Sequence, residues 1–302
     1  MRTILLLSMI AVTLGAYDFK LTPKKVTSGV HCFFGEPEAM NTTNNGNMVN
    51  TCYLDTSKGY VVIDSGSSYS YAQSAYNEMK KIKPLPIALV INTHVHDDHW
   101  LGNGFFAQMG VKVLGSDDFA HNARIDSPTR IQTHISPEAY ALTVPTLPST
   151  MIGSDTNLTI GDQKLEFHIM KKKAHSDKDM VVYVPKLKAL FAGDLVFNDR
   201  VPSLRDGDIN GWISALDELK SYGATTIVGG HGVRNDEKAM ELTYNYLTQM
   251  RSEIRSALDE GLSIDEAINK ITMPSFKSLR MMDSLHRGNV EAAYRMLEWE
   301  QK

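Results

Sequence analysis

The chain has 302 residues, of which 42% are hydrophobic and 22% charged, and its mean hydropathy is -0.23. These values exclude a disordered or fibrous protein and are typical of a globular chain that buries a substantial core. The 31 Lys and Arg residues against 35 Asp and Glu give a formal net charge of -4, and no basic stripe gathers the positive ones. We therefore expect a small-molecule substrate and no nucleic-acid partner.

The first 16 residues have the pattern of a secretory signal peptide. Arg2 precedes an apolar run from Ile4 to Leu14, and the small residues Gly15 and Ala16 follow. This run is shorter than the roughly 20 residues that a membrane-spanning helix needs, and no later stretch reaches that length. We predict a cleaved signal over residues 1–16 and a periplasmic or secreted protein. A buried first strand or a short anchor helix is the alternative.

The predicted elements of the first half mix strands and helices. Residues 30–66 predict three strands around an Asn-rich turn, and they end in the acidic turn YVVIDSG. Helical spacing of apolar residues predicts a helix over 68–82, and IALVIN over 87–92 predicts a buried strand. Residues 101–125 then predict helix, strand and helix. This alternation is typical of an α/β protein.

Two cysteines, Cys32 and Cys52, lie in neighbouring predicted strands on either side of the Asn-rich turn. An oxidising compartment would allow them to form a disulfide. Two buried free thiols are an equally good interpretation, because the pairing geometry cannot be read from the sequence.

The second half begins with a long excursion over residues 127–154, which carries four prolines and no clear period. Loops of this kind often border binding sites. Neither a linker nor a repeat divides the sequence, so we predict one catalytic domain over 17–302. The sequence predicts no particular oligomeric state. The later elements are predicted as a hairpin turning at Gly161 and Asp162, strands over 181–197, a helix over 209–222, a strand over 225–232, and helices over 236–261, 263–271 and 289–300.

The densest group of potential metal ligands is THVHDDHW, directly after the strand over 87–92. His94 and His96 project to the same side of an extended chain and can share one cation. Asp98 and His99 lie past the bend and can face a second. Imidazole and carboxylate ligands suit catalytic zinc, and iron or manganese also fits. A closed structural zinc or a solvated turn is the alternative, although neither cysteine is near in sequence.

HVHDDH resembles the HxHxDH signature of the metallo-β-lactamase superfamily. Four further motifs of that family follow its order, and the resemblance runs from Val30 to His231. They are VVIDSG with Asp64, KKKAHSDKDMVVYV with His175, LFAGDLVF with Asp194, and IVGGHG with His231.

This resemblance implies a four-layer αββα sandwich with two zinc ions per chain. His94, His96 and His175 would hold the first ion, Asp98, His99 and His231 the second, and Asp194 would bridge both, while Asp64 supports the metal loop from behind. A hydroxide bridging the metals would attack an ester, thioester or amide bond. Asp98 is the predicted catalytic residue, because it would hold or relay the proton.

Differences from the family pattern indicate which subfamily the sequence resembles most. Class B1 β-lactamases have a cysteine in place of Asp194 and a lysine in place of Phe197, which argues against penicillin-class substrates. The export signal, the GGHG turn and the C-terminal HRGNVEAAYRMLEWE are most similar to SoxH-like periplasmic hydrolases, including quinoprotein relay system zinc metallohydrolases. β-Lactamase activity, an iron-dependent persulfide dioxygenase type of redox enzyme and a non-catalytic metal-binding accessory protein stay open.

The sequence indicates the roles of several other residues less clearly. We expect Asp97 to be a solvated or helix-capping carboxylate, Trp100 to pack against the metal loop, and residues 171–173 to form a solvated strand end. Arg200 and Arg205 are expected at the surface of a loop that borders the site. The alternative is that they bind a carboxylate of the substrate. Five histidines receive no role, namely His31, His121, His134, His168 and His286.

Overall fold

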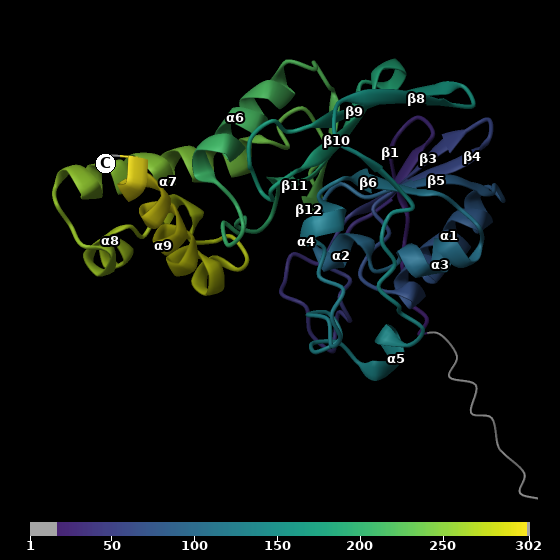
Figure 1. Ribbon diagram of the computed structural model, residues 1–302, viewed down its shortest axis with the longest axis horizontal. Coiled ribbons are helices and arrows are strands. Elements are labelled where there is room, and N and C mark those ends of the chain that lie inside the picture. Colours follow the sequence, from purple (N-terminus) through teal and green to yellow (C-terminus); the bar gives the residue numbers. More distant parts are fainter. Residues whose placement is uncertain (1–16, 301–302) are drawn as a thin grey trace, which may run out of the picture.

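Figure 1 shows the computed structural model, which describes residues 17–300. The predicted signal over residues 1–16 lies outside the described residues. Two mixed sheets stack on one another, and helices cover both outer faces. From right to left in Figure 1 the layers are α1 with α3, the first sheet, the second sheet, and α6 with α7. This arrangement confirms the predicted αββα sandwich.

The first sheet holds seven strands in chain order. Its first four strands pair antiparallel: tight turns join β1 to β2 and β3 to β4, and a longer loop over residues 34–50 joins β2 to β3. Strands β4 to β7 run parallel because segments with helices connect them. Its strands are β1 (Lys24–Thr27), β2 (Val30–Phe33), β3 (Thr51–Thr56), β4 (Gly59–Ile63), β5 (Ile87–Ile91), β6 (Val113–Ser116) and β7 (Thr150–Ile152).

The second sheet has the order β12-β11-β10-β9-β8. The predicted hairpin forms between β8 and β9, with Gly161 in the left-handed conformation at its turn. Strands β11 and β12 are parallel and are joined through α6 (Ile209–Lys220). Its strands are β8 (Thr156–Ile160), β9 (Gln163–Ile169), β10 (Met180–Val184), β11 (Ala189–Phe197) and β12 (Thr226–His231).

Side chains of β4 point alternately to the two faces of the first sheet and pack against both neighbouring layers. Val61 and Ile63 face the second sheet and pack in the same apolar cluster as Phe167. Tyr60 and Val62 point the other way, toward the helices of the first layer. Successive side chains of a strand face opposite sides, so one strand can seal two interfaces at once.

The first layer contains the two longer helices α1 (Tyr69–Ile82) and α3 (Asn103–Gln108). Ser68 caps α1 by accepting a hydrogen bond from the Tyr71 backbone N–H, and Pro84 follows closely on its last residue. Shorter helical pieces of the described chain are α2 (Asp97–Trp100), α4 (Phe119–Asn122), α5 (Pro137–Tyr140) and the 3-10 turns Pro185–Leu187 and Pro274–Phe276.

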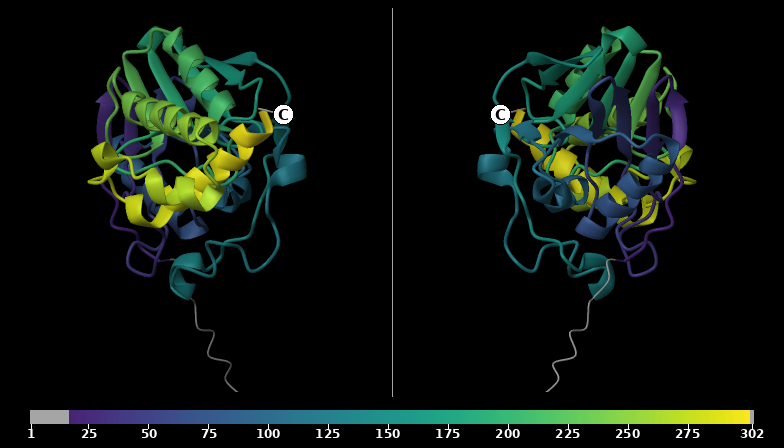
Figure 2. Two further views of the ribbon diagram at one scale, coloured as in Figure 1. Left: turned by 90° about the vertical axis from the view of Figure 1, so that its left-hand side faces the viewer. Right: turned by 90° about the vertical axis from the view of Figure 1, so that its right-hand side faces the viewer.

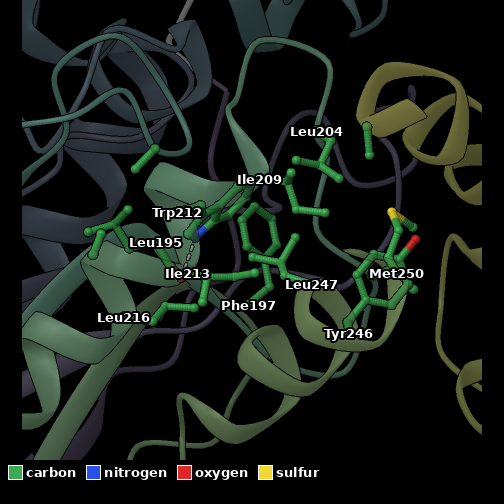
Figure 3. Close-up of a cluster of buried hydrophobic side chains, with 14 of the residues drawn as sticks. Leu195, Phe197, Leu204, Ile209, Trp212, Ile213, Leu216, Tyr246, Leu247 and Met250 are labelled. Atoms are coloured by element: carbon green, nitrogen blue, oxygen red, sulfur yellow. Dashed lines mark hydrogen bonds between the residues drawn. The ribbon is translucent and has the colours of Figure 1, made fainter. Parts of the chain in front are cut away.

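The C-terminal helices α7 (Glu241–Asp259), α8 (Ile264–Lys270) and α9 (Met282–Glu300) cover the second sheet (Figure 2, left). One apolar cluster runs from β11 through α6 and α7 to α9. Within it, Trp212 donates its indole N–H to the Leu195 carbonyl at 3.0 Å (Figure 3). Helix α9 begins seven residues before the predicted 289, because Met282 and His286 extend its buried face.

Cys32 and Cys52 face one another across β2 and β3 and form a disulfide. The alternative of two free thiols was therefore wrong for this fold. Among the described residues, no helix combines the length and the apolarity that crossing a membrane requires.

Candidate metal centre

The seven predicted ligand residues converge at one edge of the two sheets. His94 and His96 follow β5, whereas Asp98 and His99 lie in α2. The remaining three come from the second sheet and its loops. His175 lies between β9 and β10, Asp194 in β11 and His231 at the end of β12. The carboxyl ends of parallel strands meet at the same edge, which is why residues so far apart in sequence come together.

The first group consists of His94, His96, His175 and Asp194. His94 Nε2 lies 3.1 Å from His96 Nδ1, which in turn lies 2.8 Å from His175 Nε2. Asp194 Oδ2 lies 3.2 Å from His175 Nε2 and 3.7 Å from His94 Nε2. Three ring nitrogens and one carboxylate oxygen thus surround one small space.

The second group consists of Asp98, His99 and His231, and Asp194 stands between the two groups. His231 Nε2 lies 3.9 Å from Asp98 Oδ2 and 3.3 Å from Asp194 Oδ2. His99 Nε2 lies 3.1 Å from Asp194 Oδ1. The Asp194 carboxylate therefore faces both groups, in keeping with its predicted bridging position.

Gly230 makes this close approach possible. A Cβ at this position would lie 1.9 Å from Asp194 Oδ1 and 3.0 Å from His99 Cε1. Any larger residue would displace the side chains of the site, so the GGHG turn has a steric reason for its second glycine.

The Asp64 carboxylate organises the ring of His94 through Thr93. Asp64 accepts hydrogen bonds from the Thr93 backbone N–H at 2.8 Å and from the Thr93 hydroxyl at 2.9 Å. Since that hydroxyl donates to Asp64, its oxygen is left to accept from His94 Nδ1, 3.0 Å away. His94 Nε2 then carries a lone pair, and that lone pair points into the first group.

The same reasoning applies to His99 and His231. His99 Nδ1 lies 2.8 Å from Asp64 Oδ2, and His231 Nδ1 lies 2.7 Å from the Met48 carbonyl oxygen. A carbonyl can only accept, so His231 Nδ1 must donate and its Nε2 is free to bind a cation. Such partners fix ring orientation and tautomer in metal sites.

His96 has the reverse orientation. Its Nε2 lies 3.2 Å from Asp206 Oδ2, so Nδ1 is the nitrogen that faces His94 and His175. Burial and neighbouring imidazoles lower the pKa of His94, and burial likewise lowers the pKa of His96. Neutral rings with their lone pairs directed at one point repel each other unless a cation lies between them.

Arg130 holds the carboxylate of Asp98 in place. Its Nη2 donates to Asp98 Oδ1 at 2.7 Å, and the same guanidinium contacts Asp97. Burial alone would raise the pKa of Asp98, but Arg130 and the imidazoles of His99 and His231 lower it. Asp97 is buried in this ion pair, so the prediction of a solvated carboxylate was wrong, and it belongs to neither ligand group.

The donor set fits divalent cations. His99 Nε2 and Asp194 Oδ1 are buried and lie 3.1 Å apart, yet neither makes a well-aligned hydrogen bond within the described residues. Burial alone would lower the pKa of His99, yet the carboxylates of Asp194 and Asp64 raise it, so this position attracts positive charge. Imidazole and carboxylate ligands in two adjoining groups are typical of zinc, and also of iron or manganese.

A cavity of about 230 Å³ opens over these ligands. The prediction that Arg200 lies at the surface was wrong. Only 5% of the residue is exposed, and its backbone forms an isolated β-bridge with Arg280, which immediately precedes the segment leading into α9. Arg205, by contrast, is exposed and pairs with Asp206. Residues outside the ligand groups that line this cavity are Ala39, Met40, Met48, Arg130, His134, Phe197, Arg200, Ser203, Arg205, Asp206, Met281 and Leu285.

Sequence reasoning missed three supporting groups, namely Arg130, Asp206 and the Met48 carbonyl. None of them lies in a motif, and each reaches the site from a loop far away in sequence. Two advance signals existed: the proline-containing excursion over 127–154, which contributes Arg130, and the loop predicted to border the site, which carries Arg205 and contributes Asp206.

Most residues without a predicted role lie away from the ligand groups. His286 is buried and bonded to Tyr246 and to the Ile271 carbonyl, as a core histidine. His168 stacks on Tyr222. Trp100 is fully buried beside the metal loop, as predicted, and donates to the Val95 carbonyl at 2.8 Å. Residues 171–173 are exposed, also as predicted.

Known proteins share this sequence pattern and this fold. The linear primary-alkylsulfatase of a Pseudomonas species is 20% identical over 73% of this chain and 49% of its own length, so the chain spans about half of that relative. Two type 2 metallo-beta-lactamases are also similar. The one from Elizabethkingia meningoseptica is 24% identical over 69% of this chain and 78% of its own length, and the one from Bacillus cereus is 27% identical over 66% and 72%.

A solved metallo-beta-lactamase from Pontibacter korlensis superimposes with a TM-score of 0.60 at 24% identity, covering 76% of this chain and 99% of its own. This likeness establishes the fold. The family model of the metallo-beta-lactamase superfamily matches residues 44–231, which include all seven converging residues. The chain therefore belongs to the metallo-beta-lactamase superfamily and is a metal-dependent hydrolase.

Proposed function

We propose that the protein is an exported zinc-dependent hydrolase that cleaves an ester, thioester or amide bond in a small molecule. The observation that carries this proposal is the convergence of two ligand groups on Asp194 at the base of a cavity. The proposal includes two zinc ions, one in each group. It also includes the SoxH-like branch, supported by the C-terminal helices that follow the matched family region.

His94, His96 and His175 would hold one zinc ion, and Asp98, His99 and His231 the other, with Asp194 shared. Bound zinc lowers the pKa of water from 15.7 to about 7 and polarises a carbonyl, which together supply a nucleophile and an electrophile at neutral pH. No serine or cysteine nucleophile is then needed.

The chain's own residues prepare the site for that chemistry. Arg130 binds Asp98 Oδ1, so Oδ2 is the oxygen that faces His231 and the cavity. The lowered pKa of Asp98 keeps its carboxylate ionised at neutral pH, so Oδ2 can accept a hydrogen bond and hold a proton in position, which is the role proposed for Asp98. Asp64 and the Met48 carbonyl keep the rings of His99 and His231 in the binding tautomer.

Two features support export. The first 16 residues have a signal-peptide pattern, and Cys32 and Cys52 form a disulfide. Disulfides persist in oxidising compartments and are rare in the cytosol. Cell fractionation followed by N-terminal sequencing tests this point. We expect a mature chain in the periplasm or medium that begins near Tyr17, whereas a cytosolic chain that starts at Met1 would contradict export.

The hydrolase proposal is tested by screening the zinc-loaded protein against aryl esters, thioesters, lactones and nitrocefin, with and without a chelator. The name of the Pseudomonas relative adds alkyl sulfates to this panel. We expect chelator-sensitive turnover of at least one ester, thioester or amide, restored by added zinc. A zinc-loaded protein that is inert throughout the panel would favour the accessory-protein alternative.

Metal analysis of protein purified without added metal tests the identity and number of the ions. Two equivalents of zinc and no visible absorbance are expected. One equivalent of iron with an absorbance band would favour the redox alternative on the same ligands.

A further inference from the structure

Arg200 is a buried cation without an assigned partner. Its side chain lines the cavity above the ligand groups, and 5% of the residue is exposed. Nε and Nη1 are both buried and have no hydrogen-bond partner among the described residues. Buried guanidinium groups are normally paired, because desolvating an unpaired charge is costly.

Two carboxylates, those of Asp98 and Asp194, act electrostatically on Arg200, and both already have other partners. Asp98 is held by Arg130, and Asp194 is surrounded by imidazoles. No ion pair of Arg200 occurs within residues 17–300. Burial lowers the pKa of Arg200, and the carboxylates of Asp194 and Asp98 only partly offset this effect. Cations in the two ligand groups would neutralise these carboxylates further, which leaves Arg200 available to another anion.

Backbone contacts hold Arg200 in this position. Val201 donates to the Arg280 carbonyl, and Arg280 donates back to the Asp199 carbonyl, each at 3.1 Å. The guanidinium lies over the Phe197 ring, 5.5 Å from its centroid. Asp199 and Met281, which flank this pairing, both have positive φ, at 64° and 61°. Non-glycine residues are strained there, and such strain concentrates at binding sites.

An apolar rim lies beside the guanidinium. We define the rim as Met40 and Met48 from the loop between β2 and β3, and Met281 and Leu285 from the start of α9. Glu38 and Arg280 join these two segments by an ion pair at 3.0 Å. Flexible methionine side chains adapt to apolar groups of different shape. Met281 and Leu285 lie beyond the family-matched residues 44–231, so this part of the rim belongs to the chain's own C-terminal segment.

We propose that the cavity takes a substrate with one anionic group and an adjoining apolar chain, in which Arg200 binds the anion and the rim binds the chain. This inference deepens the proposed hydrolase function and rests on it for the reaction. The planar fork of a guanidinium binds carboxylate and sulfate oxygens in pairs, which suits the Nε and Nη1 donors, because no group within residues 17–300 occupies them. The substrate class is therefore a small amphiphilic organic acid that carries a hydrolysable bond.

Binding calorimetry on the zinc-loaded full-length protein tests this inference without relying on turnover. The probes are hexane-1-sulfonate, which has both anion and chain, methanesulfonate, which lacks the chain, and 1-hexanol, which lacks the anion. We expect Arg200→Gln to weaken hexane-1-sulfonate binding at least about tenfold and to change 1-hexanol binding less than about twofold. Arg200→Lys should retain part of the affinity, because it keeps the charge but loses the fork.

Arg234→Gln is the matched control, since Arg234 is exposed and already paired with Asp236. Circular dichroism of each variant checks that the fold is retained, and Arg200→Lys replaces Arg200→Gln if the latter unfolds. The inference is overturned if wild type does not bind hexane-1-sulfonate, or if the Arg200 variants bind it as wild type does. A protein that binds the sulfonate through Arg200 but hydrolyses nothing would instead contradict the proposed hydrolase function.

Discussion

The ligand groups and the rim of the cavity differ in how firmly their side chains are held. Each of the rings His94, His99 and His231 has its outer nitrogen fixed by a hydrogen bond, so these three ligands are oriented before any ion binds. The rim consists of flexible apolar side chains beside the Arg200 guanidinium, whose Nε and Nη1 have no hydrogen-bond partner in the part of the chain that the structure describes. The contrast indicates that reaction chemistry is set by the ligand groups, whereas the choice of substrate is set by the rim.

The largest effect is expected from the ligand groups. His96→Ala should remove one nitrogen of the first group and lower kcat/KM at least about a thousandfold with the fold intact, because several kcal/mol of transition-state stabilisation depend on the ion. Hydrolysis rates and zinc content measure this effect. His168→Ala, remote from the ligand groups, is the control. Full activity of His96→Ala would remove the basis of the metal-centre assignment.

A smaller loss of activity is expected when a ligand residue is retained but the residue that holds it in place is replaced. Arg130→Gln leaves Asp98 without its cation and should lower activity or zinc affinity about 10- to 100-fold. Arg130→Lys, which retains the charge, should recover part of this loss. Zinc titration against a chelating dye separates affinity from turnover. Wild-type values in Arg130→Gln would show that Asp98 needs no support from this loop.

Changes in the rim should act on binding alone. Met281→Ala or Leu285→Ala removes apolar contact area and should raise KM about threefold to tenfold for a substrate with an apolar chain, with kcat unchanged. A short-chain substrate of the same reaction should be insensitive. Equal losses of kcat for both substrates would mean that the start of α9 supports the ligand groups instead.

The disulfide should leave both regions functionally unchanged. Cys32→Ala combined with Cys52→Ala removes a crosslink that spans 20 residues and should cost about 3 kcal/mol of unfolding free energy. At 25 °C we expect kcat and KM to remain within twofold of wild type, since the bridge lies in the core between the sheets. Denaturant unfolding and steady-state kinetics measure the two quantities. A large kinetic defect would show that the core controls the ligand positions.

Much of the fold was predictable because its signals are local. A continuous apolar run in strands such as 59–63 and helical spacing over 69–82 can be read directly from neighbouring residues. The start of α9 was misplaced because its first residues are buried by helices that come earlier in the chain, which no local pattern records.

The sequence by itself determined which residues converge, because spaced motifs such as HVHDDH carry ligands within a few positions of one another. Only the tertiary structure decided what supports and surrounds them. Arg130 reaches Asp98 across 32 positions and Asp206 reaches His96 across 110, and Arg200 is buried where it forms an isolated β-bridge with Arg280. Such contacts depend on loop paths and side-chain packing between distant segments, and neither is encoded in any short stretch of sequence.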